Sequence, residues 1–171
     1  MMISLTSSRL KIIPLTLPQF ALLLKSRSDL EKELGLTISG EQLNQETQEA
    51  MEWLYDQAQQ HSKDYLWYTN WQIIDRAENR AVGSLCFIGA PNEKGDVTIG
   101  YGTDEAYQNQ GIMTEAVKEI CNWTFQQKGV KTILAESDAD NQASHRVLQK
   151  CGFEQLCSET ETQLWRRQKG N

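Results

Sequence analysis

The sequence has few of the residues that build metal centres or disulfide frameworks. It contains two histidines and four cysteines, and no two cysteines form a Cys-x-x-Cys pair. Zinc sites and disulfide frameworks need such residues in closely spaced sets, so we expect neither, and we expect no bound metal. The cysteines are expected to be reduced and to pack as small apolar side chains, which favours a cytoplasmic location. They are Cys86, Cys121, Cys151 and Cys157.

Long apolar runs and familiar nucleotide-binding motifs are also absent. No stretch approaches the roughly 18 apolar residues of a membrane-spanning helix, and the first residues lack the basic start and apolar core of a signal peptide. Neither Gly-x-Gly-x-x-Gly nor Gly-x-x-x-x-Gly-Lys-Ser/Thr occurs, which argues against a dinucleotide fold and a P-loop. The net charge is −6, which argues against a nucleic-acid partner. We therefore expect neither a membrane nor a nucleic acid as a partner.

What the chain does contain suits a single domain over residues 1–171. Hydrophobic residues make up 39% of the sequence, and a chain of this length buries a core without cross-links. Hydrophobic periodicity predicts helices from Pro18 through Leu24 and over 47–60, 111–128 and 141–151. Strands are predicted over 8–13, 66–74, 81–89, 96–102, 130–137, 153–158 and 162–167. Because helices and strands mix without strict alternation, we expect an α/β protein with a mixed (α+β) sheet.

The segment around the strand at 96–102 indicates a ligand site. Gly100 and Gly102 strip one face of this strand of side chains, which often marks close approach by a ligand. A short loop then leads through Gly111 into the long helix over 111–128. Free backbone N–H groups gather at such a helix start, and the helix dipole favours negative charge there, so the loop is a candidate anion site. Thr114 can add a hydroxyl group.

This loop resembles the pyrophosphate loop of the GNAT N-acetyltransferases. The family pattern is Arg/Gln-x-x-Gly-x-Gly/Ala, and this chain has Gln108-x-x-Gly111-x-Met113, with a larger last residue. The Thr114-Glu115-Ala116 that follows looks like the subgroup that acetylates ribosomal-protein N-termini and related amines.

A second segment, about 30 residues later, also resembles this family. Its pattern is an asparagine, a small residue three positions on, often a tyrosine seven on, and then Gly-Phe. This chain has Asn141, Ser144 and Gly152-Phe153, but Leu148 stands in place of the tyrosine. Asn141 can bond the pantetheine arm or cap its own helix, or do both.

The resemblance implies a fold and a co-substrate. The family fold is a mixed, mostly antiparallel sheet of six to seven strands, flanked by about four helices. The sheet is split between the fourth strand, here 96–102, and the fifth, here 130–137. Acetyl-CoA would lie with its pantetheine arm in the split and its pyrophosphate on the backbone N–H groups of 110–114. The residues implied to bind it are Ile99, Tyr101, Gln108, Gln110, Gly111, Ile112, Met113, Thr114, Asn141 and Ser144.

Acetyl transfer needs a neutral amine, donors for an oxyanion and help for a leaving thiolate. The resemblance implies Glu136 as the base, because some family members carry a catalytic glutamate at that place; a surface glutamate is the alternative. Ser144 is the natural substitute for the tyrosine that Leu148 replaces, although a serine bonded to the preceding helical turn is an equal alternative. Weaker candidates for the base are Glu159 and Glu161.

The charge pattern predicts the kind of acceptor. Between Ser28 and Asp64, nine acidic residues stand against two lysines, which gives −7 there while the rest is close to neutral. In the resembling family the first two helices border the acceptor site, and a cleft of one charge sign concentrates the opposite ion. We therefore expect a cationic amine, either a small molecule or a peptide N-terminus, although acids at helical spacing also suit a solvated helix face. The acids are Asp29, Glu31, Glu33, Glu41, Glu46, Glu49, Glu52, Asp56 and Asp64.

Several alternatives stay open at this point. The aromatic residues Trp53, Trp67, Tyr68 and Trp71 can line an acceptor pocket or belong to the core or an interface, and Tyr101 suits the core better than catalysis. The sequence does not separate a monomer from a homodimer. The function it favours is direct transfer of an acetyl group from acetyl-CoA to a primary amine. The alternatives are a non-catalytic acyl-CoA-binding or sensor domain, a transferase of another acyl group, and a plain interaction module.

Overall fold

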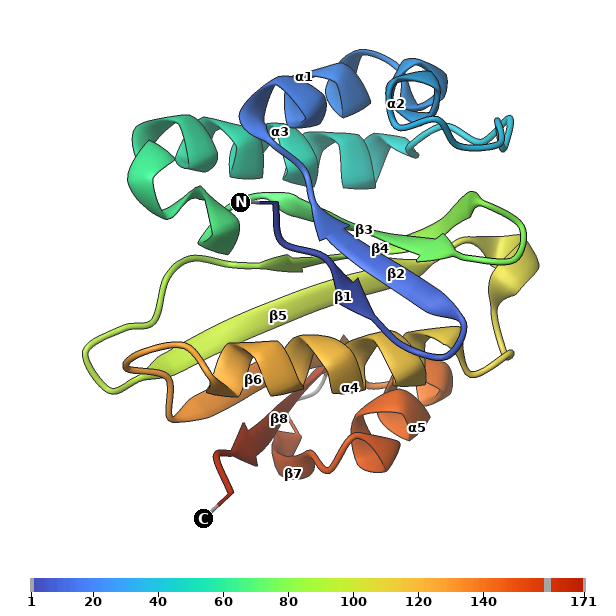
Figure 1. The fold of residues 1–171 in the computed structure, drawn as a ribbon. Coiled ribbons are helices and arrows are strands. Elements are labelled where there is room, and N and C mark those ends of the chain that lie inside the picture. The colour runs from blue at the N-terminus through green and yellow to red at the C-terminus, as the bar shows by residue number, and fades with distance from the viewer. Residues whose placement is uncertain (1, 159–160, 171) are drawn as a thin grey trace.

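The computed structural model describes residues 2–158 and 161–170, which form one eight-stranded sheet with helices on both faces (Figure 1). The strand order is β1-β2-β3-β4-β5-β6-β8-β7, and β5 and β6 are the parallel pair in an otherwise antiparallel described sheet. The predicted mixed, mostly antiparallel sheet is confirmed. The strands are β1 (Leu5–Thr6), β2 (Leu10–Pro14), β3 (Asn70–Asp75), β4 (Arg80–Phe87), β5 (Asp96–Thr103), β6 (Thr132–Asp138), β7 (Glu154–Ser158) and β8 (Thr162–Gln168).

The described α-helices cover the sheet as two groups, three above it and two below it in Figure 1. The upper group is α1 (Leu17–Lys25), α2 (Arg27–Glu33) and α3 (Gln45–Gln60). The lower group is α4 (Ile112–Phe125) and α5 (Gln142–Lys150). Short 3-10 helices precede β3 and α4; they are η1 (Ser62–Trp67) and η2 (Glu105–Tyr107). Helices on both faces explain why the apolar strand β4 is buried along most of its length.

Apolar side chains fill the space on each side of the sheet. One face of α4 is an apolar stripe at helical spacing, and this stripe is buried. This stripe consists of Met113, Ala116, Val117, Ile120, Cys121 and Thr124. Trp71 of β3 and Phe87 of β4 pack against Trp123 of α4, with ring centroids 4.9 Å and 5.8 Å from it. A second cluster lies under the upper helices, and its buried members are Leu15, Phe20, Leu23, Leu30 and Leu54.

One described strand and one described α-helix were not predicted, so there are eight strands instead of six to seven, and five α-helices instead of about four. β1 has two residues, which is too short for a periodic pattern. α2 has seven residues, and two of its three buried residues are Arg27 and Glu31, so no apolar pattern marks it. The strand predicted over 66–74 begins at Asn70, because residues 62–67 wind into η1.

The predicted split of the sheet lies between β5 and β6. These strands pair only through Asp96–Ile99 and Thr132–Ala135, whereas β5 continues to Thr103 and β6 to Asp138. Along its continuation β5 stays paired to β4, and β6 stays paired to β8, so the two halves of the sheet diverge. Beyond Ile99, the backbone of β5 therefore has no strand partner on the β6 side, and its polar groups are open to a ligand.

Close contact between β4 and β5 depends on glycine at position 83. A Cβ atom at Gly83 would lie 2.6 Å from the carbonyl oxygen of Gly102, which is a backbone atom and cannot turn away. At Gly102 itself, nothing lies within 4 Å of an added Cβ atom. The face of β5 that the sequence predicts to be bare is therefore open at Gly102.

We expect Gly83→Ala to lower the free energy of unfolding by about 1–3 kcal/mol, the usual cost of overpacking. Gly102→Ala is the matched control on the neighbouring strand, and it should change this free energy by less than ~1 kcal/mol. Urea denaturation of both variants measures the difference. Equal destabilisation by the two substitutions would show that the close contact at Gly83 does not limit packing.

Candidate functional site

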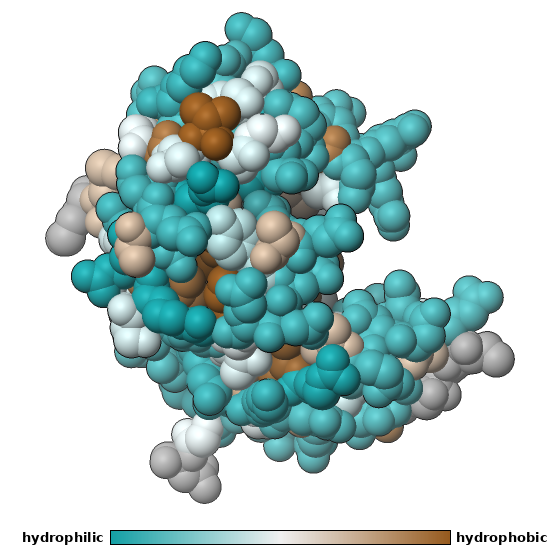
Figure 2. All heavy atoms as spheres, turned by 90° about the vertical axis from the view of Figure 1, so that its right-hand side faces the viewer, coloured by the Kyte–Doolittle hydropathy of each residue, from teal (hydrophilic) through white to brown (hydrophobic). Residues whose placement is uncertain are grey.

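A pocket of about 410 Å³ opens at the N-terminal end of α4. It lies between the loop after η2, the first turn of α4 and one side of α5. Figure 2 views this end of the molecule and shows a notch between the part with α1–α3 and the part with α4 and α5, with a mostly hydrophilic surface. Eight of the ten residues predicted to bind the coenzyme line this pocket. They are Tyr101, Gln108, Gly111, Ile112, Met113, Thr114, Asn141 and Ser144.

The start of α4 is free of the side-chain cap that every other described α-helix has. Those caps are Thr16, Ser26, Asn44 and Asn141. In α4 the position is held by Gly111, whose φ of 76° lies in the left-handed region that glycine adopts without strain. No side chain of the described residues therefore caps the N–H groups of the first turn, and an anion can bind them.

Gln110 is the predicted loop residue that does not line this pocket. Its side-chain amide donates to the carbonyl oxygen of Ala106 at 3.2 Å, and its own carbonyl oxygen accepts from Arg9 Nη1 at 3.0 Å. Ile112 and Met113 line the pocket although their side chains are buried, so they offer mainly backbone. The large Met113 side chain fits because it packs into the core rather than into the loop.

Glu115 fastens the start of α4 to the turn between β1 and β2. Its carboxylate accepts hydrogen bonds from the Ser7 hydroxyl, from the Arg9 backbone N–H at 3.0 Å and from Arg9 Nε at 2.8 Å. Burial alone would raise the pKa of Glu115, but these hydrogen bonds and the Arg9 charge outweigh it and lower the pKa to about 2. The contact holds the Arg9 guanidinium beside the loop, where Nη2 would lie 3.5 Å from a Cβ atom on Gly111.

Two cations that line this pocket, and a third that lies beside its loop, were not predicted. Arg9 escaped prediction because it stands 106 residues before Glu115, and no local pattern joins them. Arg146 and Lys150 are exposed on α5 and line the pocket. Their four-residue spacing places them on one helix face, and this signal could have identified them.

A second pocket, of about 310 Å³, lies in the split itself. It is lined by Ile99 and Tyr101 of β5, by Glu136 of β6, and by Asn141 and Ser144 at the start of α5. The two residues predicted to act in catalysis, Glu136 and Ser144, therefore line one pocket. Asn141 caps α5, because its Oδ1 accepts the backbone N–H of Ser144 at 3.1 Å.

Tyr101 reaches the same place from the opposite wall. Its ring packs against the core, as predicted, but its hydroxyl oxygen lies 2.8 Å from Ser144 Oγ. Burial raises the pKa of Tyr101 to about 12, against the opposing effect of the hydrogen bond with Ser144. Leu148, at the place of the family tyrosine, is fully buried and contributes no polar group to the pocket.

A third pocket, of about 360 Å³, lies between the upper helices and the strands β3–β5. Gly102, Thr103 and Gln108 line both this pocket and the pocket at α4, so the two adjoin at the glycine-bearing end of β5. Gln72 of β3 pairs with Ser84 of β4, which pairs with Gly102, so these three lie side by side on one face. The floor of the third pocket is therefore polar.

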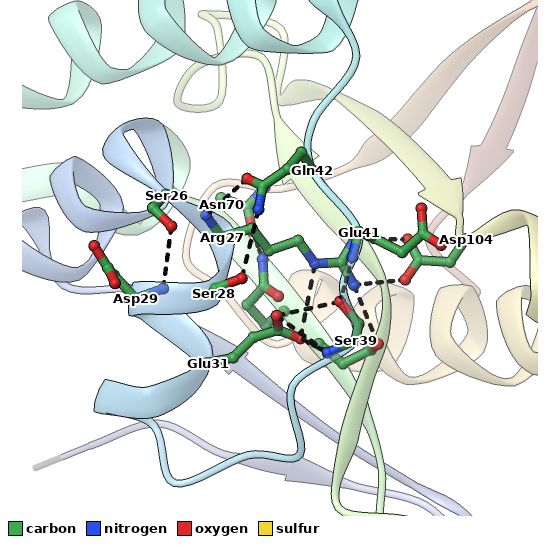
Figure 3. Close-up of polar contacts among 12 residues, drawn as sticks. Ser26, Arg27, Ser28, Asp29, Glu31, Ser39, Glu41, Gln42, Asn70 and Asp104 are labelled. Carbon is green, nitrogen blue, oxygen red and sulfur yellow. Dashed lines mark hydrogen bonds and ion pairs between the residues drawn. The ribbon is translucent and has the colours of Figure 1, made fainter.

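Arg27 holds one wall of the third pocket in place (Figure 3). Its guanidinium donates to the two carboxylate oxygens of Asp104 at 2.5 Å and 3.1 Å, and to the carbonyl oxygen of Ala81 at 3.3 Å. Glu31 lies 3.9 Å from Arg27 Nε and accepts hydrogen bonds from the backbone and hydroxyl of Ser39. Burial acts to lower the pKa of Arg27, but the hydrogen bond and charge of Asp104 raise it overall. These contacts join α2 and the chain after it to the end of β5.

The acidic segment does not act as one charged surface. Glu31 is buried against Arg27, so it is not a free charge in a cleft. Asp29 and Glu33 do not line the third pocket, whereas Glu41 does. The acids of α3 are exposed on its outer side, as the alternative of a solvated helix face predicts. They are Glu46, Glu49, Glu52 and Asp56.

The aromatic residues considered for an acceptor pocket lie elsewhere. Trp71 is fully buried in the core, and Trp67 packs against the same cluster. Tyr68 stacks on His61 with the ring centroids 4.5 Å apart, and Trp53 is 55% exposed. Among the described residues that line the third pocket there is no aromatic side chain, and the alternative of core residues holds for Trp67 and Trp71.

Comparison with known proteins places the chain in a family of acetyltransferases. Residues 9–154 match the family described as the acetyltransferase (GNAT) domain, and the chain belongs to that family. It is 28% identical over 152 residues to the uncharacterised N-acetyltransferase YjdG of Bacillus subtilis (strain 168), which covers 89% of this chain and 90% of YjdG. The predicted family is confirmed.

Solved structures share the fold at low sequence identity. The ribosomal-protein-S5-alanine acetyltransferase from Vibrio fischeri has a TM-score of 0.70 and 17% identity, over 97% of this chain and 96% of that one. RimL, a ribosomal L7/L12 alpha-N-protein acetyltransferase solved in complex with coenzyme A, has a TM-score of 0.69 and 17% identity, over 97% and 98% of the chains. At this identity the likeness shows the fold alone.

The predictions about metal binding, membrane-spanning helices and cysteines are compared with the residues that the structure describes. Within residues 2–158 and 161–170, no group of three or more His, Cys, Asp and Glu residues could hold a metal ion. No helix in the same ranges has the length and apolar character needed to cross a membrane. Cys86, Cys121 and Cys151 are free thiols. The side chain of Cys157 and the candidate base Glu159 lie outside the described residues.

Glu115→Gln should destabilise the protein in a pH-dependent way. The pKa of Glu115 falls from an ordinary 4.5 to about 2 on folding, so its contribution is full above pH 4.5 and is lost as the pH falls towards 2. Since Arg9 is partly exposed, we expect a loss of only about 1–2 kcal/mol at pH 7. Thermal unfolding between pH 7 and pH 2 checks this. Glu119→Gln, one turn along α4, should have little effect, and a Glu115→Gln deficit that is constant with pH would contradict the prediction.

Proposed function

We propose that this chain is an N-acetyltransferase that moves an acetyl group from acetyl-CoA directly to a primary amine of a small molecule or a protein N-terminus. The observation that carries the proposal is the arrangement of three pockets around the unpaired end of β5. One pocket offers helix N–H groups, one contains Glu136 and Ser144, and one has a polar floor. Membership of the GNAT family supports acetyl transfer, and the fold neighbour RimL was solved with coenzyme A.

The polar groups that line the first two pockets suit the pyrophosphate and the pantetheine arm of the coenzyme. Its pyrophosphate is proposed to accept hydrogen bonds from the N–H groups of 110–114, which Gly111 lets it approach closely. Arg146 and Lys150 bring positive charge to the same pocket, where charge-assisted hydrogen bonds to phosphate are strong. Arg9, which is paired with Glu115, lies beside the loop. The pantetheine arm is proposed to run along the open backbone of 99–101. Gln108 and Asn141 are proposed to contact it from the pocket walls.

Acetyl-CoA supplies the acetyl group as a thioester, and the residues of the split act on the amine, the carbonyl oxygen and the sulfur. Glu136 takes a proton from the incoming ammonium group, directly or through water, so that the amine can attack. Unpaired N–H groups of β5 beyond Ile99 donate to the carbonyl oxygen as it gains charge. The Ser144 hydroxyl donates a hydrogen bond to the sulfur as the thiolate leaves, and this contact strengthens in the transition state.

The third pocket is the proposed acceptor site. It adjoins the coenzyme pocket at Gly102, which has no side chain to separate an amine from the thioester. The charge of Arg27 is matched by Asp104, so the unpaired charges on the rim are those of Glu41 and Glu105. These charges support a cationic acceptor, but through Glu41 and Glu105 rather than through most of the acidic segment.

One observation favours a second candidate, a non-catalytic acyl-CoA-binding or sensor domain. The position of the family tyrosine is taken by the buried Leu148, which removes one donor for the thiolate. Ser144 lines the split and can serve in its place, so we give priority to catalysis.

The binding step is tested by thermal unfolding with coenzyme A. A ligand at one hundred times its Kd adds about 2.7 kcal/mol, which corresponds to a rise in Tm of about 5–10 °C for a chain of this size. Gly111→Glu should abolish the rise, because it puts a carboxylate where the phosphates bind. Gly170→Glu, near the chain end, should keep it.

The catalytic step is tested by thiol release from acetyl-CoA over a panel of amines. A rise in Tm without release by any amine would favour the sensor domain over the transferase. No rise in Tm at millimolar coenzyme A would contradict the proposed coenzyme site itself.

The charge of the acceptor is tested by salt and by Glu41→Gln. For a cationic amine, raising the salt from 0.1 M to 1 M should raise KM about 2–5-fold, because the Debye length falls from about 10 Å to about 3 Å. Glu41→Gln should raise KM by a similar factor at low salt. Glu46→Gln removes the same charge from the outer side of α3 and is the matched control. A KM that changes neither with salt nor in Glu41→Gln, or a preference for acidic acceptors, would show that these charges do not select the acceptor.

A further inference from the structure

The hydrogen-bonded hydroxyls of Tyr101 and Ser144 join the two walls of the split. The residues are 43 positions apart in the chain, and they come from β5 and α5. Both line the pocket at α4 and the pocket in the split, so the contact lies where these two pockets meet. No local sequence pattern predicts the contact, because it depends on how α5 packs beside the divergent strand.

The direction of this hydrogen bond follows from the chemistry of the two hydroxyls. Each has one proton to donate and two lone pairs that accept. A phenol is far more acidic than an aliphatic alcohol, so it is the better donor and the poorer acceptor. We therefore assign the Tyr101 proton to Ser144 Oγ at 2.8 Å rather than to the Ser144 carbonyl oxygen, the other acceptor of the phenol, which lies farther away at 3.5 Å. The proton of Ser144 is then free to point elsewhere in the pocket.

We propose that Tyr101 is a positioning residue that directs the only hydroxyl proton of Ser144 at the sulfur of the leaving thiolate. The inference rests on the proposed acetyl transfer. When the carbon–sulfur bond breaks, its electron pair stays on sulfur, and the Ser144 hydroxyl stabilises that charge by donating a hydrogen bond. The ammonium nitrogen loses its first proton to Glu136 or water before it attacks and forms the carbon–nitrogen bond, and it loses its second proton to water as the amide forms; the released thiolate takes a proton from solvent. Tyr101 keeps its own proton throughout.

Other features of the site fit this role. Burial keeps the Tyr101 phenol protonated, since its pKa is raised to about 12, so it remains a donor at neutral pH. Ser144 is also held from its backbone side, where its N–H donates to Asn141 Oδ1 at 3.1 Å. Because its hydroxyl oxygen is bonded to Tyr101 and its backbone N–H to Asn141, Ser144 loses less conformational freedom when its hydroxyl contacts the sulfur. This is the benefit of a preorganised donor. Chains of hydrogen bonds also strengthen one another.

Tyr101→Phe is the test, because it keeps the ring that packs against the core and removes only the hydroxyl. We expect kcat to fall about 3- to 10-fold, as for one lost hydrogen bond, with the Kd of coenzyme A within twofold of the wild type. Tyr65→Phe removes the same hydroxyl from η1, which lines none of the three pockets, and should leave kcat unchanged. A merely structural effect would lower stability or weaken coenzyme binding instead.

The double variant Tyr101→Phe/Ser144→Ala separates positioning from an independent role. If Tyr101 acts through Ser144, the double variant should be no slower than Ser144→Ala alone. Two effects that multiply, or a Tyr101→Phe variant with wild-type kcat, would overturn the inference while leaving the proposed function intact. A wild-type protein that releases no thiol with any amine would instead defeat the proposed function.

Discussion

The short parallel pairing of β5 with β6 is the constraint on which the rest of the site depends. The two strands share only four paired positions, and each then follows its outer neighbour. This divergence leaves one edge of β5 without hydrogen-bond partners in the middle of a sheet, where an unpaired backbone is costly unless something binds it. The pocket in the split lies at this edge, and the pockets at α4 and under the upper helices adjoin its glycine-bearing end.

Charged contacts between segments far apart in the sequence hold the walls of these pockets in place. Glu115 ties the β1–β2 turn to the start of α4, and this also places the Arg9 guanidinium beside the loop before α4. Arg27 performs the same task at the third pocket, the proposed acceptor site, where it joins α2 to the end of β5 through Asp104. Because β5 leads directly into the loop before α4, both contacts act on the same short stretch of backbone.

The fold was predictable where local patterns are strong. The α4 stripe, the glycines of β5 and the two family motifs are all visible within a few residues. The family resemblance that the motifs carry implies the split between β5 and β6, which the structure contains. The two-residue β1 and the charged α2 escape prediction because neither has an apolar period. Arg9 and the Tyr101–Ser144 contact escape because they join residues far apart in the chain. The count of acidic residues wrongly included Glu31 among the free charges, since a sequence does not show that its carboxylate is buried against Arg27.

A crystal structure of the protein with bound acetyl-CoA is the most direct test of a coenzyme site centred on the split. We predict that the pyrophosphate oxygens lie within hydrogen-bond distance of backbone N–H groups of residues 110–114. We also predict that the thioester sulfur lies beside Ser144 Oγ, between β5 and β6. A coenzyme bound outside the split, or a sulfur atom distant from Ser144 and Glu136, would contradict both the coenzyme site and the catalytic roles assigned to these residues.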